Sequence, residues 1–103
     1  MDKVFIVQFD WATPDAEGID LYVYRNYDDA YDKFKQLICE ERNPELSWVG
    51  DLEFDDDGYP VDDKYEFSFE DNNSNESEVY WHIRDNSDWY VHSYIDLLVK
   101  EIL

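Results

Sequence analysis

The sequence has very few basic residues. Of its 103 residues only eight are Lys or Arg, whereas 27 are Asp or Glu, so the formal net charge is −19. A protein that binds nucleic acid or an anionic membrane neutralises phosphates with cationic side chains. Direct binding to DNA, to RNA or to such a membrane is therefore strongly disfavoured, and a charged partner is expected to be basic.

Cysteine, glycine, proline and long apolar runs are also scarce. The single cysteine, Cys39, cannot form an intramolecular disulfide, which fits a reducing compartment. The apolar run near the N-terminus, Val4–Val7, has four residues, too few for a signal-peptide core or a membrane span. Three glycines and three prolines exclude fibrous and low-complexity classes. We expect a cytoplasmic protein.

Apolar and aromatic residues, in contrast, are plentiful. They make up 44% and 18% of the chain, which separates it from disordered acidic tails. About a hundred residues suffice for one domain, and we assign residues 1–103 to a single domain. Solubility needs a net charge of only about two to eight in magnitude. The excess negative charge therefore indicates a binding function. Two simpler alternatives are an acidic surface of the kind found in halophiles and a surface charge that accumulated without a function.

The spacing of apolar residues in the first half of the chain predicts two strands followed by a helix. Residues 3–9 and 19–25 read as strands and are expected to form a hairpin. Asn26 has the character of a helix N-cap, and acids follow it at the positive end of the helix dipole. The helix is expected to end at Asn43 and Pro44. Its apolar stripe consists of Tyr27, Ala30, Tyr31, Phe34, Leu37 and Ile38.

Three further strands are predicted in the second half, at residues 47–54, 64–70 and 78–84. The strand at 64–70 alternates cleanly between aromatic and polar residues, which is typical of an antiparallel strand with one solvated face. The inward-facing side chains of the strand at 78–84 are Val79, Trp81 and Ile83.

The C-terminal segment fits two structures. Apolar residues between Val91 and Ile102 recur at helical spacing, whereas residues 85–88 can instead turn a hairpin whose return strand begins at Trp89. We favour a short extended piece at 89–91 followed by a helix. The predicted fold is a compact α+β domain, an antiparallel sheet of about five strands with two helices in the order ββα-βββ-α.

Acidic residues are concentrated in the middle of the chain. Residues 51–78 contain 12 acids and one base, so about a quarter of the chain carries −11 of the total −19. An ordinary solvated strand face mixes both signs of charge, which this stretch does not. The concentration therefore favours a binding surface over a general effect on solubility.

Two sets of these acids recur at every second residue. Asp51, Glu53 and Asp55 form one set, and Glu66 and Glu70 belong to the other. Alternate residues of a strand share a face and lie about 6.6 Å apart, with the next strand about 4.8 Å away. A duplex carries one charge per about 1.7 Å of its axis, so a sheet face with this spacing offers a comparable array.

Acids that alternate before a glycine are also typical of calcium loops. Glu53, Asp55, Asp57 and Gly58 align with the first half of the EF-hand pattern, but its twelfth position is Lys64, where a bidentate Glu is required. An EF-hand is therefore not expected. Weak binding of divalent cations stays open for a group of aspartates, which are Asp55, Asp56, Asp57, Asp62 and Asp63.

Other catalytic and metal-binding patterns are missing. His82 and His92 have no cysteine at zinc-ligand spacing, and His82 is expected on the solvent side of its strand. Cys39 has no identifiable base, and there is neither a GxSxG motif nor a Gly-rich phosphate loop. Paired glycosidase-type carboxylates cannot be recognised by counting among 27 acids. We predict a non-enzymatic protein without a cofactor, a catalytic residue or a metal site.

Binding to a basic protein is the function class that remains. Tyr and Trp supply contact area and stack on guanidinium groups, and carboxylates pair with Arg through two hydrogen bonds. Rings that can serve this purpose, or lie in the core, are Tyr59, Tyr65, Tyr80, Trp81, Trp89 and Tyr90. The predicted partner-binding residues are Asp51, Glu53, Asp55, Asp56, Asp57, Asp62, Asp63, Glu66 and Glu70.

In its size, its charge, its acidic stretch from Asp51 to Glu78 and its α+β pattern, the chain resembles a group of small acidic inhibitors. These are the anti-restriction and anti-CRISPR proteins that phages and mobile elements make against host defences and that mimic DNA. The resemblance implies that the protein occupies a Lys/Arg-lined groove of a CRISPR-Cas effector or restriction enzyme and keeps the nucleic acid out.

Two other classes stay open. An immunity protein or antitoxin that neutralises a basic toxin nuclease needs the same acidic surface and the same fast, salt-sensitive association. A metal-buffering or calcium-dependent protein is the other, and it predicts a thermal shift in millimolar calcium.

Overall fold

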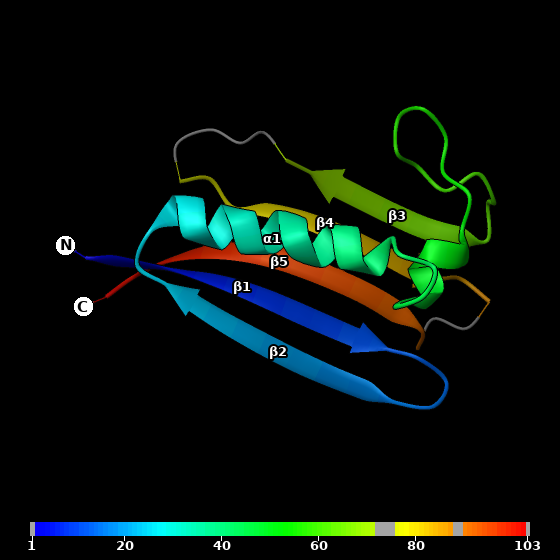
Figure 1. Cartoon of the computed structure of the whole chain (residues 1–103), viewed down its shortest axis with the longest axis horizontal. Helices are drawn as coiled ribbons and strands as arrows, with labels where there is room; N and C mark the ends of the chain where they lie inside the picture. Colours follow the sequence, from blue (N-terminus) through cyan, green and yellow to red (C-terminus); the bar gives the residue numbers. More distant parts are fainter. Residues whose placement is uncertain (1, 72–75, 88–89, 103) are drawn as a thin grey trace.

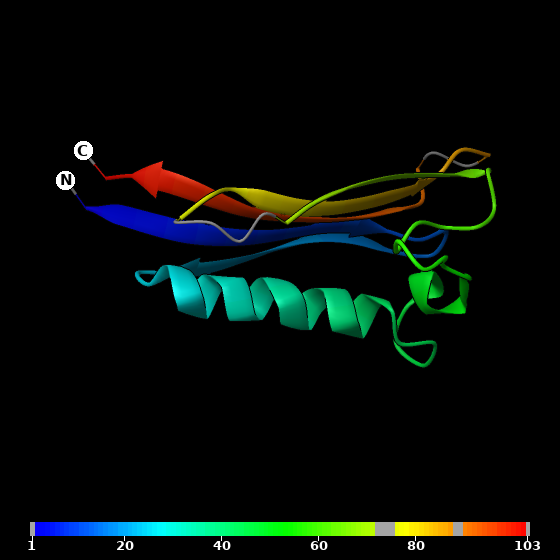
Figure 2. The ribbon, with the colours of Figure 1, turned by 90° about the horizontal axis from the view of Figure 1, so that it is seen from above.

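An antiparallel sheet with a long helix on one face makes up the fold. The computed structural model describes residues 2–71, 76–87 and 90–102. The strands lie in the order β2-β1-β5-β4-β3 (Figure 1), and the helix lies on one side of them (Figure 2). The predicted α+β class with a five-stranded antiparallel sheet is confirmed. In chain order the elements are β1 (Lys3–Ala12), β2 (Glu17–Tyr24), α1 (Tyr27–Glu41), the 3-10 helix η1 (Trp48–Asp51), β3 (Tyr65–Glu70), β4 (Val79–Asp85) and β5 (His92–Glu101).

The N-terminal hairpin forms as predicted. β1 pairs with β2 on one edge and with β5 on the other, so it is a central strand whose backbone groups are bonded on both sides. Phe5 and Val7 on its helix-facing side are 3% and 0% exposed and belong to the core. The predicted central position of this strand is therefore confirmed.

The helix α1 also follows its sequence signals. The side chain of Asn26 accepts a hydrogen bond from the backbone N–H of Asp28 at 2.8 Å, which caps the first turn. The predicted stripe packs on the sheet, with Phe34 completely buried. The helix ends at Glu41, just before Asn43 and Pro44, as expected. Among the described residues, no helix is both long and apolar enough to span a membrane.

The predicted C-terminal helix is wrong, because residues His92–Glu101 form the strand β5. Buried and partly exposed residues alternate along β5, and Ser93, Ile95 and Leu97 on the helix side are fully buried. The strand lies between β1 and β4, where it gains hydrogen bonds on both edges. The hairpin alternative is the one that forms, although Trp89, its predicted first residue, lies outside the described residues.

The predicted strand at 47–54 is also wrong. Residues Trp48–Asp51 form η1, and the side chain of Ser47 accepts a hydrogen bond from the N–H of Val49 at 3.2 Å, which caps it. Gly50 lies so close to the end of α1 that a Cβ atom there would be 2.3 Å from the carbonyl carbon of Asn43. This close packing folds the chain back against the helix, which an extended strand cannot do.

The strands at 64–70 and 78–84 are confirmed as β3 and β4. Val79, Trp81 and Ile83 of β4 face the core and are 1%, 3% and 0% exposed. On β3, Phe67 packs against Trp81 with ring centroids 5.8 Å apart, while the polar residues of β3 point to the opposite face. The sheet therefore buries one face, and the helix side defines the core.

The opposite face of the sheet has no helix over it in the described part of the chain (Figure 2). On the edge strand β2, Ile19, Leu21 and Val23 are 63%, 60% and 63% exposed on this face. The tyrosines that alternate with them, Tyr22 and Tyr24, lie on the other face and pack against the core.

Candidate functional site

The acidic segment between η1 and β3 is a loop fixed by aromatic rings. The ring of Phe67 on β3 lies 6.3 Å from that of Phe54 and 5.2 Å from that of Tyr59. Phe54 and Pro60 also form an isolated antiparallel bridge. The loop stands beside β3 at the outer edge of the sheet (Figure 1). Ring contacts thus hold its acids against the sheet.

Two of the predicted contact residues shape this loop. A carboxylate oxygen of Asp55 accepts hydrogen bonds from the N–H groups of Asp57 and Tyr59 at 2.9 and 3.0 Å. A carboxylate oxygen of Asp62 accepts from the N–H of Lys64 at 3.0 Å. Aspartates that bond the backbone two residues ahead are typical turn formers. Asp55 and Asp62 therefore have a structural role besides their charge.

All nine predicted contact residues are exposed, but they do not form one strand face. Asp51 ends η1, and Glu53 and Asp55 lie in the loop, so the predicted regular array of these three is wrong. Glu66 and Glu70 do share the open face of β3, and Glu66 forms an ion pair with Arg84. Glu66 is the only one of the nine with a basic partner in the described part of the chain, and Asp55 and Asp62 accept hydrogen bonds from the backbone. The other six have neither kind of partner there: Asp51, Glu53, Asp56, Asp57, Asp63 and Glu70.

The acids are not arranged as a metal site. Within residues 2–71, 76–87 and 90–102 there is no group of three or more His, Cys, Asp or Glu side chains placed to hold a metal ion. The five aspartates between 55 and 63 are thus spread along the loop rather than gathered around one point.

A second feature is a pocket of about 340 Å³ where α1 and β1 end. The rings of Phe9, Trp11 and Trp48 line it, together with Leu46 at its rim, whose side chain is 65% exposed. The indole Nε1 of Trp48 is buried and has no hydrogen-bond partner among the described residues. The lining of the pocket is therefore largely aromatic.

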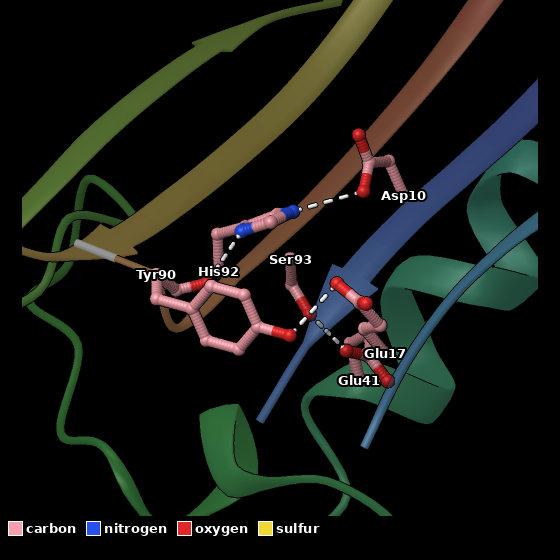
Figure 3. Close-up of polar contacts among 6 residues, drawn as sticks. All are labelled: Asp10, Glu17, Glu41, Tyr90, His92 and Ser93. Atoms are coloured by element: carbon pink, nitrogen blue, oxygen red, sulfur yellow. Dashed lines mark hydrogen bonds and ion pairs between the residues drawn. The ribbon is translucent and has the colours of Figure 1, made fainter. Parts of the chain in front are cut away.

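The floor of this pocket is polar. Glu41, the last residue of α1, is 9% exposed, and it accepts a hydrogen bond from the hydroxyl of Ser93, which is fully buried on β5 (Figure 3). The side chain of Ser47 also lies close enough to favour the charged form of this carboxylate. The neighbouring base, Arg42, has its guanidinium 4.5 Å from the ring centroid of Phe54 and forms no ion pair with Glu41 in the described structure.

The sequence contained a signal for Glu41 that we missed. Ala30, Phe34 and Leu37 lie on the buried stripe of α1, and Glu41 is four residues beyond Leu37. Residues three and four apart share a helix face, so this acid continues the apolar stripe. An acid at an apolar position of a helix is the pattern that identifies such a buried carboxylate.

Burial raises the pKa of the Glu41 carboxyl, the hydrogen bonds from Ser93 and Ser47 oppose this shift, and the charge of Glu40 adds to it. An acid with a raised folded-state pKa favours folding when protonated, and this contribution is lost as the pH rises through that pKa.

We therefore expect Glu41→Gln to gain stability relative to the wild type as the pH rises. Near pH 4 the two proteins should be similarly stable, because protonated Glu and Gln are alike. Toward neutral pH the variant should become the more stable one, since it avoids the burial of a charge. Urea unfolding at a series of pH values measures the difference, and a difference independent of pH would contradict the shift.

Next to Ser93 on β5, His92 points to the open face. Its Nε2 lies 2.9 Å from a carboxylate oxygen of Asp10, and its Nδ1 lies 2.8 Å from the carbonyl oxygen of Tyr90 (Figure 3). Consecutive residues of a strand project to opposite faces. Ser93, His92 and Asp10 therefore cannot act as a nucleophile, base and orienting acid, since the serine hydroxyl faces Glu41 on the other side of the sheet.

The open face carries a second His–Asp pair. His82 of β4, on the solvent side as predicted, has its Nε2 2.8 Å from a carboxylate oxygen of Asp96 on β5. The ring of Tyr94 lies 4.6 Å from those of both His82 and His92. Sequence reasoning missed these pairs because both depend on β5, which was predicted to be a helix.

Comparisons of the chain with protein-family models, with curated proteins and with solved structures found no match.

Proposed function

We propose that the protein is a non-enzymatic acidic inhibitor that mimics nucleic acid. It occupies the Lys/Arg-lined groove of a nucleic-acid-binding enzyme in the cytoplasm, such as a CRISPR-Cas effector or a restriction enzyme. The observation that carries this proposal is the set of six exposed, unpaired acids on the loop, η1 and β3. Repulsion among so many like charges lowers the stability of a folded protein. Their retention therefore indicates that they have a function.

The density of charge along the molecule supports the mimicry. The longest dimension is 44 Å, and a duplex of that length carries about 26 phosphates at one charge per 1.7 Å of axis. The chain carries 27 carboxylate side chains against eight bases. The whole chain therefore carries about as many carboxylates as a duplex of its length carries phosphates.

Apolar side chains among the acids support a protein partner. Tyr59 and Val61 of the acidic loop are 46% and 56% exposed. A tyrosine beside carboxylates stacks on a guanidinium group that the carboxylates bind. Charge then sets the rate of association. The apolar side chains add contact area whose contribution to binding is not screened by salt.

The test is capture of a DNA-binding enzyme from a lysate, with release by DNA. The wild-type chain, immobilised at low salt, should retain a basic enzyme that a duplex oligonucleotide displaces, and retention should fall steeply as salt is added. The triple reversal Asp56→Lys, Asp57→Lys and Asp63→Lys should abolish retention, because it inverts the unpaired charge and spares the turn-forming acids.

The matched control reverses three exposed acids elsewhere, Asp15, Asp32 and Glu45. Each reversal changes the charge by two, so both triple variants have a net charge of −13. Equal retention by the two variants, or retention that added salt and DNA leave unchanged, would refute the proposal. A captured toxin nuclease that DNA does not displace would identify an immunity protein instead.

A further inference from the structure

The position of Glu41 is unfavourable for a carboxylate in two independent ways. It lies in the last turn of α1, at the negative end of the helix dipole, where no basic residue is present. It is also only 9% exposed. A buried carboxylate is normally paired with a cation, and the described chain offers this one only serine hydroxyls.

The surroundings of Glu41 match a cation that comes from outside. Among the described residues no Lys or Arg lines the pocket, whereas the indole rings of Trp11 and Trp48 do. Aromatic faces bind cations, and Trp binds them best. The chain has a net charge of −19, so its field draws cations rather than anions to the opening at Leu46.

The size of the pocket restricts the class of ligand further. At about 340 Å³ the pocket is at the lower end for small-ligand sites, which suits a single side chain better than a large cofactor. An arginine side chain fits this pocket, because its guanidinium is a planar cation that pairs with a carboxylate and stacks on aromatic rings.

We propose that the pocket formed by Trp11, Trp48, Glu41 and Ser93 binds an arginine side chain of the partner protein. The guanidinium pairs with Glu41 at the floor, and its stem and plane lie against the indole rings. This inference rests on the proposed function, because it requires that the partner protein is basic. It adds a specific anchor to a surface that otherwise acts through charge.

A small probe tests the pocket without the partner. N-acetyl-L-arginine methylamide, titrated into isotope-labelled protein, should shift the indole N–H signals of Trp11 and Trp48 in NMR spectra. The citrulline analogue has nearly the same shape but a neutral urea group, and we expect it to bind about tenfold more weakly or worse. Glu41→Gln should weaken binding of the arginine probe by a similar factor, because it removes the charge and keeps an acceptor.

The outcomes separate this inference from the proposed function. Equal binding of the two probes, or no loss in Glu41→Gln, overturns the pocket assignment and leaves the acidic loop untouched. The triple Lys variant of the loop should still bind the arginine probe, since the loop acids do not line the pocket. Should Glu41→Gln fold poorly, the comparison of the arginine and citrulline probes on the wild type decides alone.

Discussion

Replacing Gly50 by alanine is expected to destabilise the fold by about 3 kcal/mol or more. A Cβ atom at this position would lie 2.3, 2.4 and 2.5 Å from backbone atoms of Asn43 and Pro44. Backbone atoms cannot turn aside as a flexible side chain does, so η1 must move away from the end of α1. Chemical unfolding followed by Trp fluorescence measures the loss.

The matched control is Gly58→Ala in the acidic loop. Gly58 has φ of +87° and no atom within 4 Å of a Cβ position, so its substitution causes only backbone strain, about 1–2 kcal/mol. The same chemical change is thus made with and without a steric obstacle. A smaller loss at Gly50 than at Gly58 would show that η1 moves freely, and would contradict the close packing.

Movement of η1 also has a consequence for the pocket. Two residues that line the pocket belong to this segment, since Trp48 is the first residue of η1 and Ser47 is its N-cap. A displaced η1 therefore separates them from Glu41 and Trp11. We expect Gly50→Ala to lose the arginine probe even under conditions where the protein stays folded.

Phe34→Ala is expected to have an effect of similar size, about 3–5 kcal/mol. Phe34 is fully buried in the middle of α1 and belongs to the cluster that joins the helix to β1, β4 and β5. Its removal leaves a cavity that a sheet bonded along most of its strands cannot close. With a total stability of about 5–15 kcal/mol for a natural domain, this loss brings the protein close to unfolding.

Cys39→Ala serves as the control on the same helix. Cys39 is exposed, and alanine favours helix, so its stability should change by no more than about 0.5 kcal/mol. Both variants are compared by thermal and urea unfolding. A loss at Phe34 no larger than at Cys39 would mean that α1 is not anchored by its apolar stripe.

Elements with a single periodicity were predictable. The helix carries a cap at Asn26, a stripe that includes Phe34, and a stop at Pro44, and all three are local signals that agree with one another. Strand β4 was equally clear, because Val79, Trp81 and Ile83 alternate with polar residues. Local pattern was sufficient where it matched only one kind of element.

Elements whose pattern fits two kinds of secondary structure were not predictable from the sequence. The apolar residues of β5 satisfy a helical spacing and also an alternation, and pairing with both β1 and β4 selects the strand. In the segment at 47–54 alternation suggested a strand, but Gly50 allows a close approach to α1 that no local signal reveals. In both cases contacts with distant parts of the chain decide, as tertiary context often does.

The candidate sites divide in the same way. The sequence by itself determined the charge of −19 and its concentration between Asp51 and Glu78, because composition does not depend on folding. Only the tertiary structure decided which of these acids turn the loop, which one pairs with Arg84 and which remain unpaired. It alone brought Glu41 and Ser93, 52 residues apart, to the floor of one pocket. Such a pairing depends on strand order and helix placement, which are properties of the whole fold.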